Sequence, residues 1–401
     1  MNPPAHPTDL FAADYGLYGE LVEDIAGQLA ATAAQRDQQG GTALAERQLL
    51  RDSGLLALAV PRAHGGLEAD WPLILRIVRR FAQADSSVAH LFGFQHLQVA
   101  SVVLFGSLPQ QQRYLGATVS ERWFWGNAVN ARDARLSVTA TPQGYVLDGI
   151  KSFCSGARDS DVLNVSVALS DDPADRIYAV VPTARVGVTV NDDWDNMGQR
   201  QTDSGSVSFD QVLVRHDEVL GPPGSAGSVR ATLRNLIGQL VLTEIYIGNA
   251  QGALADSLDY LRSQARPWPM SGLSVAHEDP YAQLRTGDLW IKLRSATALA
   301  DQALEQFQQA WQAGHGLTAD ARGELSVAIA AARVHAGRLA LDITADIFEL
   351  MGARATTRRA ATDRYWRNVR VHTLHDPLDY RQKGVGNWLL TGQAPSPFGY
   401  G

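Results

Sequence analysis

Two histidines near the C-terminus are candidates for acid–base chemistry. His372 and His375 stand three residues apart, and on a helix this spacing places both side chains on one face. An imidazole titrates near neutral pH, so it can protonate or hydrogen-bond an oxygen atom of a ligand. The structural alternative is an ion pair of His375 with Asp376 or Asp379. We favour a catalytic role for His375 over His372.

A second group of residues follows a helical spacing further upstream. His90, Phe94, Leu97 and Ser101 lie at i, i+4, i+7 and i+11, which predicts one face of a helix. A lone histidine on such a face is more often a core residue than a functional one. The residues alone therefore leave His90 open between a core position and the wall of a site.

An amide and a hydroxyl in the middle of the chain are candidates for ligand binding. On a strand, Phe153 and Ser155 face one side while Cys154 faces the other, and Trp125 and Asn127 share a face in the same way. Polar groups beside aromatic side chains can hydrogen-bond the polar edge of a bound ring. Alternatively, each polar side chain satisfies backbone groups at the end of its own strand.

Arginines supply candidate anion sites. Arg266 follows an apolar helix and precedes Pro267-Trp268, and a guanidinium fork matches the geometry of a phosphate. A solvated surface arginine is the alternative. A later cluster is typical of a solvated or salt-bridged face, and its members are Arg354, Arg358, Arg359, Arg364, Arg367 and Arg370.

Common catalytic motifs are absent from the sequence. It has no G-x-G-x-x-G after a strand, no Walker A loop, no H-E-x-x-H and no G-x-S-x-G. The single cysteine, Cys154, excludes an intrachain disulfide and a cysteine-based zinc site, and we expect it to be inert. The ten histidines form no clear ligand pair. We therefore expect no metal site, and a serine hydrolase is disfavoured as well.

The hydrophobic periodicity changes twice along the chain. Helical spacing dominates from about residue 15 to 117, period-two alternation from 118 to about 225, and helical spacing again to near the C-terminus. In the middle block, VTATPQGYVLDGIKSFCSGA predicts a hairpin with Pro142-Gln143-Gly144 at its turn. We therefore predict an α+β protein with an N-terminal helical domain (1–117), a central antiparallel β domain (118–226) and a C-terminal helical bundle (227–401).

The bulk properties are typical of a soluble cytoplasmic protein. The formal net charge is -7 and the charges are mixed along the 401 residues, which disfavours nucleic-acid binding. The N-terminus has no basic segment followed by an apolar run, so no signal peptide is expected. Polar residues interrupt the most apolar stretch, 236–255, which predicts a core helix rather than a membrane span.

The order of helices, strands and helices, together with seven short segments, resembles the acyl-CoA dehydrogenase superfamily. The segments are HLFGFQH, WFWGNA, FCSGARDSD, NDDWDNMGQRQTDSGS, QARPW, MGARA and YWRNVRVHTLHDPLDY. They fit one branch better than the others, the reduced-flavin-dependent monooxygenases that act on dibenzothiophene, sulfones or alkanesulfinates. The likeness runs from about residue 20 to about 395 and implies the acyl-CoA dehydrogenase fold.

Two departures separate the sequence from the true dehydrogenases. Those enzymes need a glutamate base near the flavin, and the corresponding stretch here, VHTLHDP, offers His372 and His375 instead. Their glycine-rich adenosine-binding segment is replaced by LMGARATTRR. Both differences disfavour acyl-CoA oxidation, and the second favours FMN, in its reduced form FMNH2, over FAD. Phe94 stands where the desulfurising relative has tyrosine, which leaves the substrate open.

The resemblance also implies roles for the candidate residues. Asn127 and Ser155 would hydrogen-bond the N5 and O4 edge of the flavin, and His375 would act on the flavin C4a-hydroperoxide. Arg266 would reach the flavin phosphate of a neighbouring subunit. The other implied roles are His372 and His90 as catalytic or wall residues, Phe94 and Phe153 in the substrate pocket, Trp194 against the flavin or the pocket, and Arg354 as a phosphate contact.

Together these features predict a two-component monooxygenase. Reduced FMN would come from a separate NAD(P)H-dependent flavin reductase, because the chain has no nicotinamide motif. The predicted substrate is a small organosulfur compound (a thioether, a sulfone or a sulfinate), and the resemblance implies a homotetramer. The alternatives are an FAD-dependent acyl-CoA dehydrogenase that uses another base, and a helical scaffold without flavin chemistry.

Overall fold

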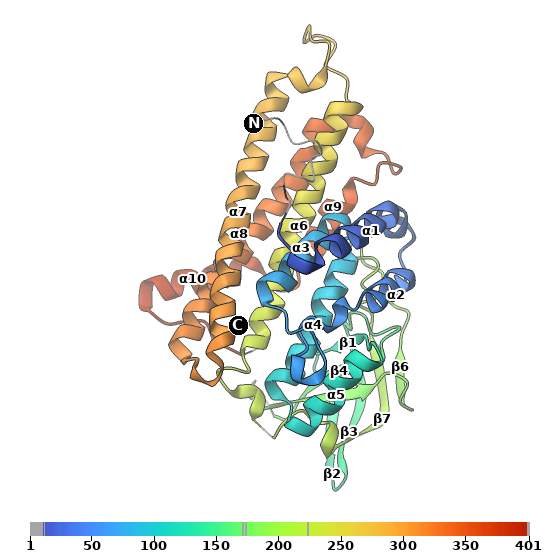
Figure 1. Cartoon of the computed structure of the whole chain (residues 1–401), viewed down its shortest axis with the longest axis vertical. Coiled ribbons are helices and arrows are strands. Elements are labelled where there is room, and N and C mark those ends of the chain that lie inside the picture. The colour runs from blue at the N-terminus through green and yellow to red at the C-terminus, as the bar shows by residue number, and fades with distance from the viewer. Residues whose placement is uncertain (1–10, 12, 171, 173–174, 223, 399–401) are drawn as a thin grey trace.

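The chain runs through helices, then strands, then helices, as the periodicity predicts (Figure 1). The computed structural model describes residues 11, 13–170, 172, 175–222 and 224–398. Residues 1–10, on which the absence of a signal peptide was argued, and the last three residues of the tail lie outside this description. The α+β class is confirmed, while the domain boundaries at 117 and 226 stay a prediction.

The N-terminal block contains α1 (Gly19–Gln39), α2 (Leu44–Ser53), α3 (Trp71–Ala84), α4 (Ser86–Phe105) and α5 (Leu108–Ser120). Helix α4 begins where the Asp85 carboxylate accepts hydrogen bonds from the backbone N–H groups of Ser87 and Val88. It is long and apolar enough to cross a membrane, but 89% of its apolar window is buried inside the protein. Core helices of globular proteins pass the same length test, and α4 packs as one, against α3 and a long C-terminal helix.

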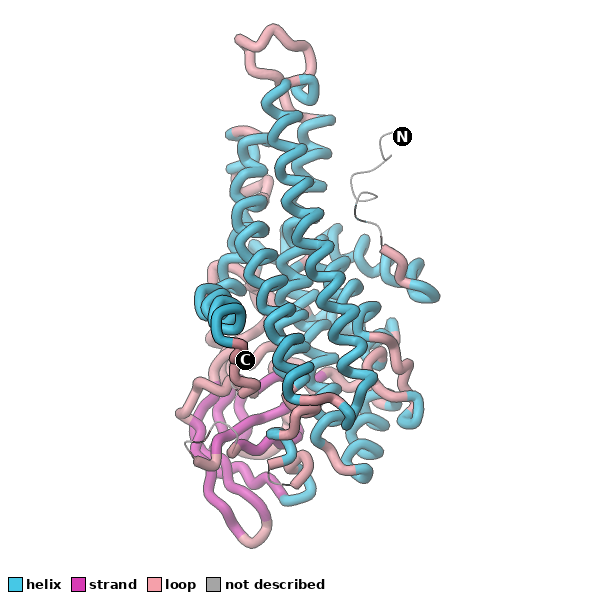
Figure 2. Tube along the Cα trace, turned by 90° about the vertical axis from the view of Figure 1, so that its left-hand side faces the viewer, coloured by secondary structure: helices cyan, strands magenta, loops and turns pink. Residues whose placement is uncertain are grey.

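The C-terminal block contains α6 (Leu233–Ser263), α7 (Pro280–Ala313), α8 (Ala319–Met351), α9 (Asp363–Thr373) and α10 (Leu378–Thr391). The three longest helices pack on one another and extend away from the end of the molecule that carries the strands (Figure 2). A Cβ atom on Gly248 of α6 would lie 2.1 Å from the carbonyl oxygen of Arg79. Only glycine therefore allows α6 to approach α3 this closely.

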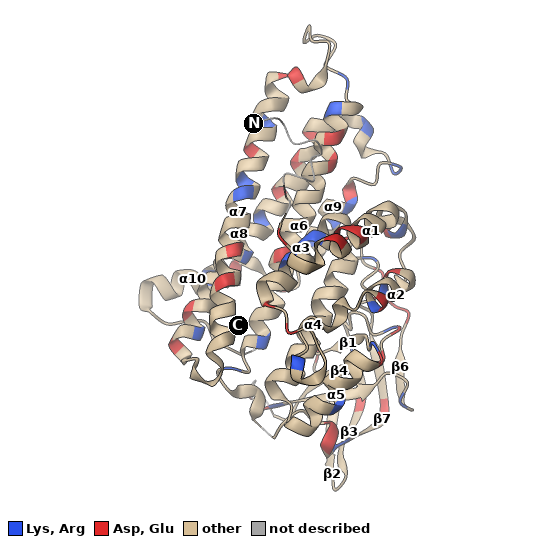
Figure 3. Ribbon diagram, in the orientation of Figure 1, with Lys and Arg blue, Asp and Glu red and all other residues tan. Residues whose placement is uncertain are grey.

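Short 3-10 helices connect these elements, at Gly16–Tyr18, Leu55–Ala57, Arg62–His64, His216–Glu218, Ser225–Gly227, Ala276–Glu278, Gly314–Gly316 and Ala353–Thr356. Acidic and basic residues are interspersed along the helices and strands (Figure 3).

The strands form two sheets that share one hydrophobic core. β1 (Trp125–Ala128), β4 (Val162–Ala168) and β5 (Arg176–Pro182) make one sheet in the order β1-β4-β5. β2 (Leu136–Thr141), β3 (Gly144–Lys151), β7 (Val207–Arg215) and β6 (Val188–Val190) make the other in the order β2-β3-β7-β6. Buried side chains from both sheets belong to one core cluster, so the sheets pack against each other.

One pair of strands departs from the predicted antiparallel arrangement. β1 and β4 pair in parallel, with Trp125 opposite Val162, whereas the other described strand pairs are antiparallel. Parallel neighbours need a long crossover connection. The chain between them forms the β2–β3 hairpin of the other sheet, which provides that connection.

The end of the hairpin also differs from the prediction. β2 and β3 do turn at Pro142-Gln143, but β3 ends at Lys151. Phe153 has a left-handed backbone with φ 57°, which a regular strand cannot contain. The predicted strand is therefore wrong at Phe153, Cys154 and Ser155, which lie in a loop. The predicted facing is nevertheless found, because Phe153 and Ser155 line one cavity while Cys154 lies in the core.

Candidate active site

A large cavity lies where α4, α6 and the end of α9 meet the loops of the β block. Its volume is about 610 Å³, within the range of cofactor and substrate pockets. Arg266 and Arg354 do not line it in this single chain. The predicted site residues that do line it are His90, Phe94, Asn127, Phe153, Ser155, Trp194, His372 and His375.

A row of hydroxyl groups beside His90 fixes the hydrogen atom on its ring. The Thr202 hydroxyl donates to the Gln199 carbonyl oxygen (2.9 Å), which can only accept. The Ser204 hydroxyl must then donate to Thr202, and the Ser155 hydroxyl to Ser204, each at 2.7 Å. Nε2 of His90 lies 3.0 Å from the Ser155 oxygen, whose proton is already used. His90 is therefore protonated at Nε2 and carries a lone pair at Nδ1.

Burial keeps two imidazoles neutral at the cavity wall. Burial lowers the pKa of His90 to about 3 and holds the pKa of His372 well below its ordinary value. The two rings lie 4.9 Å apart, and His90 also stacks on Phe94 at 4.0 Å. Nδ1 of each ring is buried without a hydrogen-bond partner among the described residues. Two ring nitrogens at the wall can thus hydrogen-bond a ligand.

His375 lies just beyond α9 rather than on it. The helix ends at Thr373, and the backbone N–H of His375 donates to the His372 carbonyl (3.1 Å) in a turn. The predicted shared helical face is therefore wrong, although both imidazoles line the cavity. Nδ1 of His375 also lies 3.4 Å from Oδ1 of Asp376, so the ion-pair alternative and a place at the cavity wall coexist.

The carboxylate beside His375 is held ionised by arginines. Asp376 is buried and pairs with Arg333 on one side and with Arg381 (2.6 Å) on the other. Burial raises the pKa of Asp376, but the hydrogen bond with His375 and the charge of Arg333 outweigh it, so the pKa lies well below its ordinary value. This anion orients Nδ1 of His375 toward itself.

A second buried chain of hydrogen bonds fixes the Asn127 amide. Nη2 of Arg234 (3.1 Å) and Nδ2 of Asn164 (2.9 Å) both donate to Oε1 of Gln98. Because a guanidinium can only donate, this end of Gln98 is the oxygen, and its Nε2 donates to Oδ1 of Asn127 at 3.0 Å. The NH2 group of Asn127 therefore remains for a ligand in the cavity.

Aromatic side chains flank the opening of the cavity. The rings of Phe153 and Trp194 lie 6.1 Å apart, edge to face, and Nε1 of Trp194 donates to the Gln199 carbonyl (2.9 Å). Phe153 is 57% exposed, so its ring can contact a ligand. Cys154 points into the core instead, where burial raises the pKa of its thiol to about 12, so the expected inert thiol fits its surroundings.

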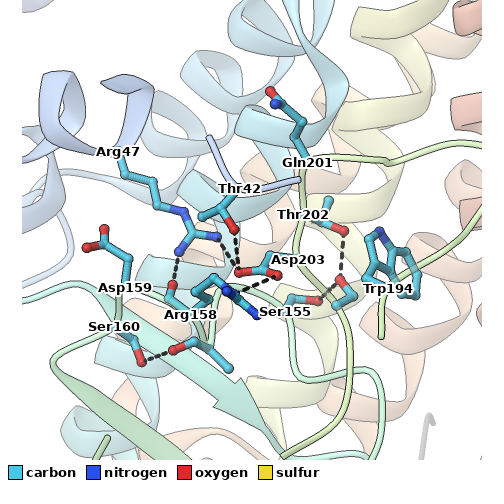
Figure 4. A network of polar contacts seen from close by, with 12 residues as sticks. Thr42, Arg47, Ser155, Arg158, Asp159, Ser160, Trp194, Gln201, Thr202 and Asp203 are labelled. Atoms are coloured by element: carbon cyan, nitrogen blue, oxygen red, sulfur yellow. Dashed lines mark hydrogen bonds and ion pairs between the residues drawn. The ribbon is translucent and has the colours of Figure 1, made fainter. Parts of the chain in front are cut away.

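Buried charges tie the loop that carries the hydroxyl row to α2 (Figure 4). Arg47 of α2 is fully buried, its Nη2 lies 3.6 Å from the Asp203 carboxylate, and its Nη1 donates to the Arg158 carbonyl. The Thr42 hydroxyl donates to the same carboxylate (3.2 Å). Figure 4 shows Asp203 directed toward Arg47 and Thr42, while the neighbouring Thr202 points the other way, toward Trp194, and both Thr202 and Trp194 line the cavity. Helix α2 thus positions the hydroxyl row.

The two predicted phosphate-binding arginines lie elsewhere. Arg266 is in the loop that follows α6, and Arg354 is exposed in the 3-10 helix Ala353–Thr356. The role of Arg266 in a neighbouring subunit stays a prediction.

Sequence reasoning missed several polar residues of the site, and four of them fix its hydrogen bonds. Thr202 and Ser204 lie in a loop whose contacts depend on the fold. Gln98 and Arg234 carried a usable signal, because Gln98 follows His90 by eight residues on an apolar helix and Arg234 is a charge at the start of another. Buried polar side chains of this kind usually bind each other or a ligand.

Three family models match consecutive parts of the chain. They describe the N-terminal, middle and C-terminal domains of acyl-CoA dehydrogenases and match residues 19–122, 126–212 and 240–380. The matched order is helical, β and helical, which confirms the predicted acyl-CoA dehydrogenase fold.

Individual similar proteins show to which branch of this family the chain belongs. A probable FMNH2-dependent monooxygenase, SfnC of Pseudomonas putida, is 44% identical over 95% of this chain and 96% of its own. The structure of methanesulfinate monooxygenase MsuC from Pseudomonas fluorescens matches with a TM-score of 0.92 at 42% identity, over 95% of this chain and 99% of its own. FMN-bound TdsC, a dibenzothiophene monooxygenase from Paenibacillus sp. A11-2, matches with a TM-score of 0.91 at 40% identity, with the same coverage. The chain therefore belongs to the acyl-CoA dehydrogenase family, in the branch that contains these FMN-dependent monooxygenases.

Proposed function

We propose that this protein is an FMNH2-dependent monooxygenase that transfers one oxygen atom from O2 to a small organosulfur compound. The observation that carries the proposal is the chemistry of the cavity wall. Two neutral imidazoles, an amide NH2 group and a row of hydroxyls lie around one space. The one carboxylate among the described lining residues, Asp195, is exposed. The NH2 group of Asn127 on this wall can donate hydrogen bonds to oxygen, and the described lining residues include no buried carboxylate to remove an α-proton from a thioester.

The polar groups of the cavity fit FMN. Nδ1 of His90 is an acceptor and the NH2 group of Asn127 is a donor, and an isoalloxazine ring presents both donors and acceptors along its polar edge. When bound, reduced FMN supplies two electrons and the carbon atom at which O2 is activated. The residues proposed to hold it are Asn127, Ser155 and Trp194, with Arg266 of a neighbouring subunit and Arg354 at the phosphate.

The side chains of the protein itself orient the ligands and handle protons. The Asp376 carboxylate accepts a hydrogen bond from Nδ1 of His375. Nε2 of the ring then accepts a hydrogen bond when the imidazole is neutral, and donates a hydrogen bond or a proton to an oxygen atom in the cavity when the imidazole is protonated. The neutral rings of His90 and His372 add polarity without a charge. Phe94 and the aromatic residues at the opening exclude water from the reacting centre.

The wider setting belongs to the same proposal. A separate NAD(P)H-dependent flavin reductase supplies FMNH2, the protein works in the cytoplasm, and the active assembly is a homotetramer. MsuC is a methanesulfinate monooxygenase and TdsC a dibenzothiophene monooxygenase, which supports an organosulfur substrate here. Fluorescence titration of subunit mixtures can test the assembly: inactive Arg266→Ala subunits mixed with subunits mutated in the cavity should regain FMN sites.

Oxygen incorporation tests the function directly. The purified protein, supplied with FMNH2 by an added flavin reductase under 18O2, should place one 18O atom into a sulfide, sulfone or sulfinate. Oxidation of butyryl-CoA with an artificial electron acceptor, without O2, would support the dehydrogenase alternative. Failure to bind FMN in either redox state would support the scaffold alternative.

A further inference from the structure

Arg234 is a buried cation that lines the cavity without an acidic partner among the described residues. It is 6% exposed and lies in the first turn of α6. Its Nε donates to the Ser101 hydroxyl (2.6 Å) and its Nη2 to Oε1 of Gln98 (3.1 Å), and both acceptors are neutral. The ring of Tyr178 lies 5.3 Å from the guanidinium carbon. No acidic side chain of the described residues forms an ion pair with it.

Arg79 and Arg333, two other buried arginines, show the usual solution. Arg79 pairs with the buried Glu244 and with Asp301 (2.6 Å), and Arg333 pairs with Asp376. Burying a guanidinium without a counter-charge is unfavourable, so a missing partner calls for an explanation. Nη1 of Arg234 makes no hydrogen bond within the described residues, and the side chain faces the cavity. A ligand in the cavity can supply the missing negative charge.

The surroundings of Arg234 favour an anion further. Through Gln98, Arg234 forces the Asn127 amide to offer its NH2 group, so a second donor is available. The other charged side chains among the described lining residues, Arg132 and Asp195, are both exposed. The buried part of the wall therefore carries a positive charge and hydrogen-bond donors, without a buried carboxylate.

We infer that Arg234 is the specificity residue that binds the anionic group of a sulfinate substrate, with the Asn127 amide as a second donor. This inference rests on the proposed function, because of the thioether, sulfone and sulfinate considered there only the sulfinate is charged. Its two oxygen atoms match a guanidinium fork as a carboxylate does. The reaction balances as RSO2⁻ + FMNH2 + O2 → RSO3⁻ + FMN + H2O: sulfur and FMNH2 each give two electrons, and one oxygen atom goes to sulfur and the other to water.

A matched pair of probes tests the charge. Ethanesulfinate and ethyl methyl sulfoxide share their size and sulfur oxygen, but only the first is an anion. Arg234→Met removes the charge and keeps an unbranched apolar side chain. Replacing buried charged groups by apolar side chains of similar volume often leaves the stability of a protein unchanged. Arg234→Lys restores a charge without the fork. Arg230→Met is the control, because Arg230 precedes the same helix but does not line the cavity.

The wild-type protein should bind and oxygenate ethanesulfinate in preference to the sulfoxide. Arg234→Met should raise the KM for ethanesulfinate roughly 10- to 100-fold, because this is the effect of losing one charge-assisted hydrogen bond. The KM for the sulfoxide should stay within about threefold, Arg234→Lys should recover part of the loss, and Arg230→Met should match the wild type. Calorimetry of ethanesulfinate binding without flavin should show the same order of affinities, independently of turnover.

Three results would overturn the inference. Equal losses for both probes would mean that Arg234 acts only by holding Gln98 and Asn127. A lower affinity of Arg234→Met for FMN, with riboflavin binding unchanged, would assign the charge to the flavin phosphate. If calorimetry showed that the wild-type protein binds ethanesulfinate no more tightly than the sulfoxide, the charge of Arg234 would have no role in substrate binding. Failure of the proposed function gives a different result from failure of this inference. If the protein were not a monooxygenase, neither probe would be oxygenated, while ethanesulfinate would still bind.

Discussion

At the scale of residues, the site depends on which atoms carry hydrogen. The Ser155 hydroxyl is the acceptor that keeps Nε2 of His90 protonated. In Ser155→Ala that N–H loses its partner in a buried place, which costs about 1–3 kcal/mol. We expect product formation to fall at least about tenfold, since the cavity wall is disturbed, while the melting temperature falls by only a few degrees.

Ser160→Ala is the matched control for this prediction. Its hydroxyl binds the Ala157 carbonyl (2.7 Å) and Thr183 (2.7 Å), and it does not line the cavity. If both variants lose activity and folded fraction in the same proportion, Ser155 serves the structure alone.

The role of His375 as a proton donor can also be tested by a single substitution. A protonated imidazole whose Nδ1 donates to an ionised carboxylate can donate a proton from Nε2, and His375→Ala removes that donor. We expect the variant to bind FMN normally and to consume O2, but to release most of it as H2O2 rather than as product. An oxygen electrode with a peroxide assay measures the ratio of product to O2. His335→Ala, on α8 outside the cavity, serves as the control. A wild-type ratio in His375→Ala would transfer the role to His372 or His90.

At the scale of elements, α2 holds the active-site loop through one buried arginine. Arg47→Met leaves the buried Asp203 carboxylate without its main partner, and breaking a buried pair from one side costs about 3–5 kcal/mol. Arg51→Met on the same helix removes a partly exposed pair with Asp159 and should cost about 1 kcal/mol or less. Urea unfolding of the two variants compares these costs. Equal free energies of unfolding would show that α2 is not fixed by Arg47.

The sequence predicted the parts of the site that depend on spacing within one element, but not those that depend on contacts between elements. Helical spacing is local, so it placed His90 and Phe94 correctly on the cavity face of α4. The loop at residues 152–155 could not be predicted in this way, because the backbone N–H of Cys154 donates to the Gly205 carbonyl (2.9 Å), which is distant in the sequence. The contact of Gln98 with Arg234 likewise joins two helices that only the fold brings together.

At the scale of the whole molecule, the order of blocks followed from periodicity, whereas the pairing of β1 with β4 did not. Periodicity reports which face of a strand is buried, but not which strand lies beside it. The family likeness supplied what periodicity could not, the identity of the fold and of the cofactor.

Stability of the whole molecule should depend on pH through a core histidine. His96 is fully buried, its ring nitrogens have no partner among the described residues, and burial lowers its pKa to about 3. Below about pH 6.5 the unfolded chain binds a proton here that the folded chain does not. Stability therefore falls as the pH falls from about 6.5 toward 3, by up to about 1.4 kcal/mol per pH unit.

The substitution His96→Leu tests this dependence. The free energy of unfolding, measured by urea titration at pH 6, 5 and 4, should decline less steeply in the variant by about that amount. His315→Leu, at an exposed position, is the control. Parallel curves for His96→Leu and the wild type would contradict the prediction.

The hydroxyl row beside His90 also affects proton transfer. Grotthuss transfer along a row of hydroxyls requires a last member that can pass a proton to water or to a base. Here the last acceptor is the peptide carbonyl of Gln199, which can do neither. The row therefore relays no proton beyond Thr202. We expect protons taken up or released in turnover to bypass these hydroxyls, so that their protonation does not change during the reaction.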